Sequence, residues 1–165
     1  MKILRAPRSR TALLALAAVG VTLATLHLPA CSTNIVDGDV TWVDSTAEAV
    51  ELMSKPRGTF GIAGTPRAAW VDPRGATEFA AEHIPGAINL PFPRIEAEHM
   101  VAFKDKDVLI VYDSDSDSSL ALTYAKRLLA LGYDEDYCMR GGLKAWKKDG
   151  HPTEKGAAPA APATR

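Results

Sequence analysis

The sequence predicts one α/β domain with a mostly parallel central sheet and helices on both of its faces. Segments of strand type and helix type alternate through the central part of the chain, an order typical of a parallel sheet. The run Val-Leu-Ile-Val-Tyr at residues 108–112 is continuously apolar in character and is expected to be a strand buried on both faces. The length of 165 residues is typical of one domain with a hydrophobic core.

The first predicted helix begins at Ser45-Thr46-Ala47-Glu48, which has the form of a capping box. We expect it to run to about Ser54, because Pro56 and Gly58 follow. Residues 57–67 then form a connection. Apolar residues at helical spacing predict the face that packs on the core: Ala47, Val50 and Met53.

Two short strands and two short helices are expected next. Residues 68–71 are an apolar run of strand type, and the turn at residues 72–75 leads into a helix near residues 76–81. A second strand over residues 87–90 ends at a proline, and a helix is expected between residues 94 and 103.

The C-terminal half continues the alternation. Residues 120–131 carry apolar residues at helical spacing, and Gly132 is positioned to end that helix. A last strand is expected near residues 136–139. A helix that carries Trp146 and ends at Gly150 then closes the domain.

The N-terminus has the anatomy of an export signal. An almost purely apolar run over residues 11–26 follows four basic residues, Lys2, Arg5, Arg8 and Arg10. The ending Leu28-Pro29-Ala30-Cys31 resembles the bacterial lipoprotein box, so we expect cleavage after residue 30 and lipidation of Cys31. Two alternatives stay open, an uncleaved membrane helix over residues 11–30 and a secreted form. All three place the domain outside the cytoplasm.

Composition defines the rest of the organisation. We expect a tether over residues 31–39, a domain over residues 40–152, and an Ala/Pro-rich disordered tail over residues 153–165. A net charge of −1 without a basic run argues against nucleic-acid binding. Of the two cysteines, Cys31 is expected to carry lipid, which leaves Cys138 without a disulfide partner and makes it a small buried hydrophobe.

Several separated motifs, in the same order, resemble the rhodanese-homology domain. They are the segments at residues 70–74, 78–91 and 108–112, together with Gly132-Tyr133, Gly141-Gly142 and Ala145-Trp146. The resemblance covers residues 40–152 and implies a three-layer sandwich with a mostly parallel sheet between helices. It also implies family-motif structural roles for eight residues: Asp72, Arg74, Glu78, His83, Gly86, Gly141, Gly142 and Trp146.

The resemblance identifies the loop after residue 112 as the counterpart of the sulfurtransferase active-site loop. This candidate loop consists of Asp113, Ser114, Asp115, Ser116, Asp117, Ser118 and Ser119. Asp113 stands where active members carry the nucleophilic cysteine, Ser116 where a glycine is usual, and Ser118 where many members have arginine. Since a carboxylate cannot form a persulfide, we expect no catalytic residue and no cofactor, and favour a protein without sulfurtransferase activity.

Asp113 has a structural alternative to catalysis. Its carboxylate can accept the backbone N–H groups that would otherwise hold a thiolate. We further expect Ser118 or Ser119 to cap the following helix, Arg74 to pair with Glu78 or face the loop, His83 to hydrogen-bond the backbone, and Trp146 to lie in the core.

Three functions stay open for the candidate loop. The first is a non-catalytic module that binds an unidentified protein or small-molecule partner. The second is binding of a divalent cation through Asp113, Asp115 and Asp117, although the turn glycine of a calcium loop is missing. The third is an enzyme, either an Asp-based phosphatase or a residual sulfurtransferase acting through Cys138. In each case we expect a lipid-anchored protein of the bacterial cell envelope that faces the periplasm, with Ser32 favouring the outer membrane.

Overall fold

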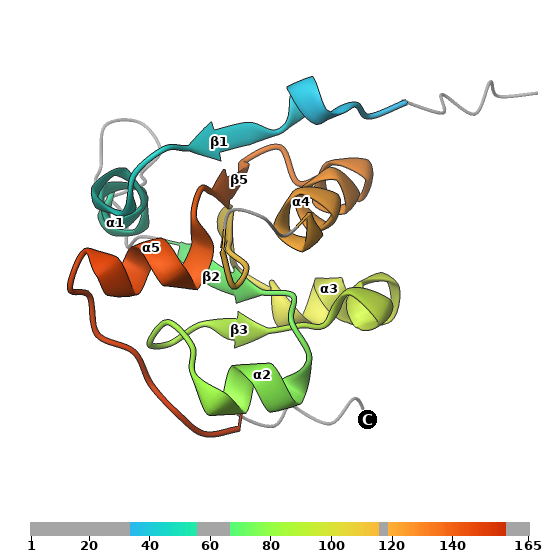
Figure 1. Cartoon of the computed structure of the whole chain (residues 1–165). Coiled ribbons are helices and arrows are strands. Elements are labelled where there is room, and N and C mark those ends of the chain that lie inside the picture. The colour runs from blue at the N-terminus through green and yellow to red at the C-terminus, as the bar shows by residue number, and fades with distance from the viewer. Residues whose placement is uncertain (1–33, 56–66, 116–118, 158–165) are drawn as a thin grey trace, which may run out of the picture. The chain divides into compact units, whose positions relative to one another are not determined.

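The computed structural model describes residues 34–55, 67–115 and 119–157, and residues 33–165 form one compact unit. A parallel five-stranded sheet crosses this unit in the order β1-β5-β4-β2-β3 (Figure 1). Its strands are β1 (Thr41–Val43), β2 (Ala68–Asp72), β3 (Ile88–Asn89), β4 (Val108–Val111) and β5 (Asp136–Met139). The parallel sheet predicted from the alternation of strands and helices is confirmed.

Helices cover both faces of this sheet. The helices are α1 (Thr46–Ser54), α2 (Ala76–Ala81), α3 (Ile95–Ala102), α4 (Leu120–Ala130) and α5 (Gly142–Lys148), with 3-10 turns η1 (Asp37–Asp39) and η2 (Phe92–Arg94). One apolar cluster joins the sheet to α3 and α4, and a second joins it to α1, α2 and α5 (Figure 1). The predicted three-layer arrangement is therefore present.

Strand β4 lies at the centre of both clusters. Leu109 and Val111 pack in the α3/α4 cluster, whereas Val108 and Ile110 pack in the opposite one, and all four are fully buried. This alternation follows from the two-residue period of a strand. Burial of each such side chain stabilises the fold by roughly 1.5–3 kcal/mol, so β4 is a firm base for the loop that follows it.

Two local predictions near the N-terminus are corrected. Strand β1 was not expected, because three residues at a sheet edge produce no recognisable apolar pattern. Helix α1 is also rotated relative to the prediction, since Thr46 and Ala49 face inward while Ala47 and Val50 are exposed. The hydroxyl of Thr46 donates a hydrogen bond to the Asp149 carboxylate at 2.6 Å, a polar contact that the apolar spacing could not reveal.

The fold extends beyond both expected domain boundaries. Within the expected tether, η1 contacts α4 through an Asp37–Lys126 ion pair of 2.8 Å. Beyond residue 152, Glu154 pairs with His83 through two backbone hydrogen bonds, and the Gly156 N–H donates to the Ala80 carbonyl at 2.9 Å. The ordered chain therefore continues past the expected start of the tail. The expected signal and Cys31 lie outside the described residues, among which no helix is long and apolar enough to cross a bilayer.

Candidate functional site

The candidate loop begins where β4 ends, at the carboxyl edge of the sheet. Open α/β sheets commonly place their functional groups at this edge. Asp113, Ser114, Asp115 and Ser119 are described by the structure, whereas Ser116, Asp117 and Ser118 lie outside the described residues.

The Asp113 carboxylate accepts backbone N–H groups, as expected. Its side chain is buried, with a residue exposure of 4%. Oδ1 accepts from the Ser114 N–H at 2.6 Å, and Oδ2 accepts from the Ala121 N–H at 3.3 Å. Ala121 lies in the first turn of α4, where N–H groups have no partner within the helix and a negative charge is stabilised.

The expected cap by Ser119 is wrong, and Ser118 lies outside the described residues. Ser119 occupies the N-cap position of α4, but its side chain makes no capping hydrogen bond. The carboxylate of Asp113, at the start of the candidate loop, accepts a first-turn N–H instead. Asp113 lies eight residues before Ala121, a longer separation than capping patterns use.

A second helix holds the backbone of the loop. The Leu143 N–H donates to the Asp113 carbonyl at 2.7 Å, and the Lys144 N–H donates to the Ser114 carbonyl at 3.0 Å. Both donors lie in the first turn of α5. The start of the loop is therefore held in two ways: α4 binds the side chain of Asp113, and α5 binds the carbonyl groups of Asp113 and Ser114.

Gly142 permits this close approach. Its φ is +53°, and a Cβ atom at this position would lie 2.2 Å from the Asp113 carbonyl oxygen. Neither the backbone conformation nor the space accommodates a side chain. The Gly141-Gly142 pair in the sequence was a signal for a close contact, but it did not reveal the contacting partner.

Arg74 forms a buried ion pair with Asp72, which corrects the expected pair with Glu78. Its Nε and a terminal nitrogen donate to the two Asp72 oxygens at 2.9 and 2.6 Å. Burial alone would lower the pKa of Arg74, but the hydrogen bond and negative charge of Asp72 raise it overall. The Glu78 carboxylate instead accepts the Gly75 N–H at 3.3 Å. Arg74 therefore stabilises the fold through Asp72 and does not pair with Glu78.

The turn around His83 is structural, as expected. Nδ1 of His83 lies 2.8 Å from the Phe79 carbonyl, and the two rings stack with centroids 3.7 Å apart. The next N–H, of Ile84, donates to the hydroxyl of Tyr112 at 3.1 Å, which ties the turn to the end of β4. No sequence pattern predicts this tyrosine contact. Gly86 adopts a φ of +72° in the same turn.

Trp146 is part of the core, as predicted. Its ring packs edge to face against Trp70 at 5.1 Å, and its Nε1–H donates to the Pro152 carbonyl at 2.7 Å. Gly141, one turn earlier, adopts a φ of +78° with Ala145 close to the position of its missing side chain. These residues position the first turn of α5 against the start of the loop.

Cys138 is the free cysteine of the described residues and is fully buried in β5. Burial raises the pKa of its thiol to about 12, so the reactive thiolate is scarce at neutral pH. This environment agrees with the prediction of a small buried hydrophobe and disfavours a role as a substitute nucleophile.

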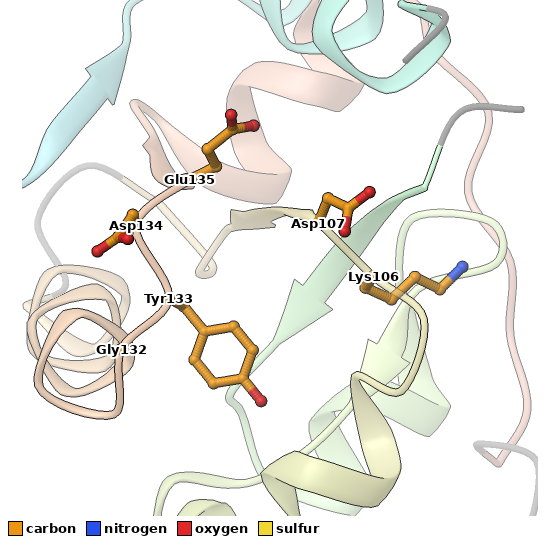
Figure 2. Close-up of a pocket in the computed structure, with 6 residues that line it drawn as sticks. All are labelled: Lys106, Asp107, Gly132, Tyr133, Asp134 and Glu135. Carbon is orange, nitrogen blue, oxygen red and sulfur yellow. The ribbon is translucent and has the colours of Figure 1, made fainter. Parts of the chain in front are cut away.

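A cavity of about 510 Å³ lies at the opposite edge of the sheet from the candidate loop. Residues that precede β4 and β5 line it: Lys106, Asp107, Gly132, Tyr133, Asp134 and Glu135. Figure 2 shows that the side chains of Lys106, Asp134 and Glu135 point in different directions instead of converging. The cavity therefore does not assemble a site with the loop.

The expected cation site receives no geometric support from the described residues. They contain no group of three or more His, Cys, Asp or Glu residues that could hold a metal ion. Both Asp113 oxygens already accept N–H groups, and Asp117 lies outside the described part of the chain. Cation binding by this loop stays a prediction.

Comparison with known proteins supports the resemblance to the rhodanese-homology domain. Residues 61–149 match the model of the rhodanese-like domain. A sulfurtransferase of Allochromatium vinosum is 35% identical over 91 residues, 55% of this chain and 82% of the relative. An uncharacterized protein of Synechocystis is 34% identical over 85 residues, 52% of this chain, and the match spans only 46% of that protein.

Solved structures show the same fold. A thiosulfate sulfurtransferase from Pseudomonas aeruginosa superposes with a TM-score of 0.56 at 25% identity, covering 71% of this chain and 20% of that chain. A Bacillus halodurans protein superposes with a TM-score of 0.55 at 22% identity, covering 70% and 77% of the two chains. Because the rhodanese-like domain model matches residues 61–149, more than half of the chain, the protein belongs to the family of rhodanese-like domains.

Proposed function

We propose that this protein is an exported, lipid-anchored rhodanese-like domain that lacks sulfurtransferase activity and acts as a binding or regulatory module facing the periplasm. The observation that carries the proposal is the state of Asp113. Its carboxylate accepts the N–H groups of Ser114 and Ala121, and by the motif resemblance it takes the position of the family nucleophile.

Sulfur transfer requires two properties that this loop does not offer. A thiolate must attack the sulfane sulfur, and free N–H groups must hold the resulting anion. A carboxylate supplies no thiolate, and in the Asp113 conformation it already uses two of the N–H groups. The carboxylates of Asp113, Asp115 and Asp117 also disfavour an anionic donor such as thiosulfate.

The enzyme alternatives fit the same geometry less well. An Asp-based phosphatase needs a carboxylate that can reach a phosphate, whereas Asp113 is buried and hydrogen-bonded to the backbone. A sulfurtransferase acting through Cys138 would need a reactive thiolate, but this thiol is buried and its pKa is raised. These contacts favour a structural role for Asp113 and Cys138 over a catalytic one.

The proposal is tested with the soluble part of the chain, residues 32–165, incubated with thiosulfate and cyanide. We expect no thiocyanate above background from the unmodified protein and measurable thiocyanate from Asp113→Cys. Asp113→Ser is the matched control, because it removes the carboxylate and leaves a side chain of similar size without a thiol. Thiocyanate formed by the unmodified protein would contradict the absence of activity, and equal rates from the Cys and Ser variants would contradict the position of the loop.

The anchor is tested separately in a bacterium that expresses the full chain. We expect Cys31→Ala to abolish incorporation of labelled fatty acid. Retention of the unmodified protein in membranes without label would instead support an uncleaved helix. Recovery of unmodified protein in the soluble envelope fraction would support the secreted form.

A further inference from the structure

Asp136 is a buried carboxyl group without a hydrogen-bond partner among the described residues. It is the first residue of β5 and is 2% exposed. Neither of its side-chain oxygens has a partner within hydrogen-bond distance. Such a group is costly to bury in its ionised form, because the protein returns none of the interactions that water provided.

The side chain lies between the centre of the sheet and its edge. It shares a face of β5 with Cys138, two residues on, which packs in the α3/α4 cluster. Leu109 of β4 is its partner in register. On the other side, the pairing of Thr41 with Tyr137 brings Val40, buried in the same cluster, level with Asp136.

The two basic residues of α4 are already paired with other carboxylates in the described part of the chain. Lys126 of α4 is paired with Asp37 of η1 at 2.8 Å. Arg127 of α4 is paired with Glu96 of α3. The other titratable groups near Asp136 are Asp39 of η1, Tyr124 of α4, Tyr137 and Cys138 of β5, and the cavity-lining residues Lys106, Asp107, Asp134 and Glu135, whereas β4 contributes none. Of these, Lys106 is positive at pH 7, but three carboxylates line the same cavity.

These surroundings favour the protonated carboxyl. Burial raises the pKa of Asp136 to about 7, and the negative charge of Asp134 acts in the same direction. The backbone N–H of Asp136 acts in the opposite direction but does not reach hydrogen-bond geometry with the carboxyl.

We propose that Asp136 is a proton-dependent latch for the edge segment, defined as residues 34–43 with η1 and β1. The protonated carboxyl lets Val40 close over it, and the ionised carboxyl favours an open edge segment in which water reaches the charge. This segment yields first because β1 is three residues long and pairs on one side only. Its Asp37–Lys126 contact is a surface ion pair, which contributes little to stability.

The latch changes the reach of the domain, a consequence that rests on the proposed anchor. The edge segment directly follows the expected lipid-bearing end of the chain. Its release would add ten residues to the tether, or about 30 Å when extended. The open state thus places the rhodanese-like domain farther from the membrane than the closed state does.

Hydrogen exchange of the soluble part of the chain, residues 32–165, tests the latch without any anchor. Exchange of the edge segment is measured by mass spectrometry between about pH 5 and pH 8 and divided by the intrinsic rate at each pH. With a pKa of about 7 when closed and an ordinary value of 3.8 when open, the opening constant should rise about 50-fold from pH 5 to 7 and change little above that. Asp136→Asn should remove this rise, and Asp136→Val provides a second non-titrating variant if the amide folds poorly.

Low concentrations of urea separate local opening from global unfolding. We expect the edge segment to exchange faster than β4 and with little dependence on urea, because local opening exposes little surface. Equal exchange rates and urea dependence in both segments would overturn the latch, as would a pH-independent edge segment or a pH effect retained in both variants. Absence of lipid on Cys31 would remove the reach argument but leave these results unaffected.

Discussion

Two buried aspartates at opposite edges of the sheet differ in what surrounds them. Asp113, at the carboxyl end of β4, is 4% exposed, and both of its oxygens accept backbone N–H groups. Asp136, at the amino end of β5, is 2% exposed, and its oxygens have no partner among the described residues. Burial alone therefore does not determine the role of a carboxyl group.

The difference follows from the geometry of a parallel α/β fold. Helix N-termini gather at the carboxyl edge of the sheet, where their unpaired N–H groups stabilise negative charge. At the amino edge, the helices present carbonyl groups instead. The carboxyl edge of this sheet can thus hold a buried carboxylate at Asp113 through N–H groups, whereas burial at the amino edge raises the pKa of Asp136.

Asp72 extends the comparison to a buried carboxylate that is paired with a charge, and its removal should have the largest effect. Asp72→Ala leaves the guanidinium of Arg74 buried and unpaired, which should lower the free energy of unfolding by about 3–5 kcal/mol. Urea denaturation measures this loss. The double variant Asp72→Ala/Arg74→Ala should lose less than the sum of the two single variants, and simple additivity would contradict the ion pair.

The pH dependence of unfolding should reveal Asp136. Its pKa in the folded protein, about 7, is above the ordinary value of 3.8, so the stability it contributes is complete below about pH 4 and is lost as the pH rises through 7. Relative to Asp136→Asn, the unmodified protein should lose up to about 4 kcal/mol over this range, less where edge opening relieves the charge. Denaturation of both proteins between pH 4 and 8 measures the difference, and parallel pH profiles would show that Asp136 has an ordinary pKa.

Gly142 tests how tightly α5 holds the loop. Gly142→Ala would bring a Cβ within 2.2 Å of the Asp113 carbonyl oxygen and should lower the free energy of unfolding by about 3 kcal/mol. Gly150→Ala is the matched control, because Gly150 has a φ of +81° but no atom within 4 Å of the added carbon. It should cost only about 1 kcal/mol, and equal losses in thermal denaturation would remove the steric argument.

The sequence predicted the sheet and its helices better than it predicted the contacts of the site. The alternation of strands and helices and the apolar run at β4 were enough to predict the parallel sheet and the helices around it. The pairing of Arg74 with Asp72, and the capping of α4 by Asp113 instead of Ser119, depend on side-chain directions that spacing does not determine. The sequence predicts a strand at Asp136, but the burial of its carboxyl without a partner among the described residues depends on tertiary packing that the strand pattern does not reveal.

Asp113→Ala should have the smallest of these effects on stability and makes the comparison most direct. The N–H groups of Ser114 and Ala121 lose their acceptor, which should lower the free energy of unfolding by about 2 kcal/mol. Ser119→Ala, at the N-cap itself, should change it by less than about 0.5 kcal/mol, because the serine side chain makes no capping bond. Thermal denaturation with equal losses for the two variants would show that Asp113 does not cap the helix. A larger loss for Asp113→Ala than for Ser119→Ala would show that the Asp113 carboxylate, and not the serine hydroxyl, satisfies the first turn of α4.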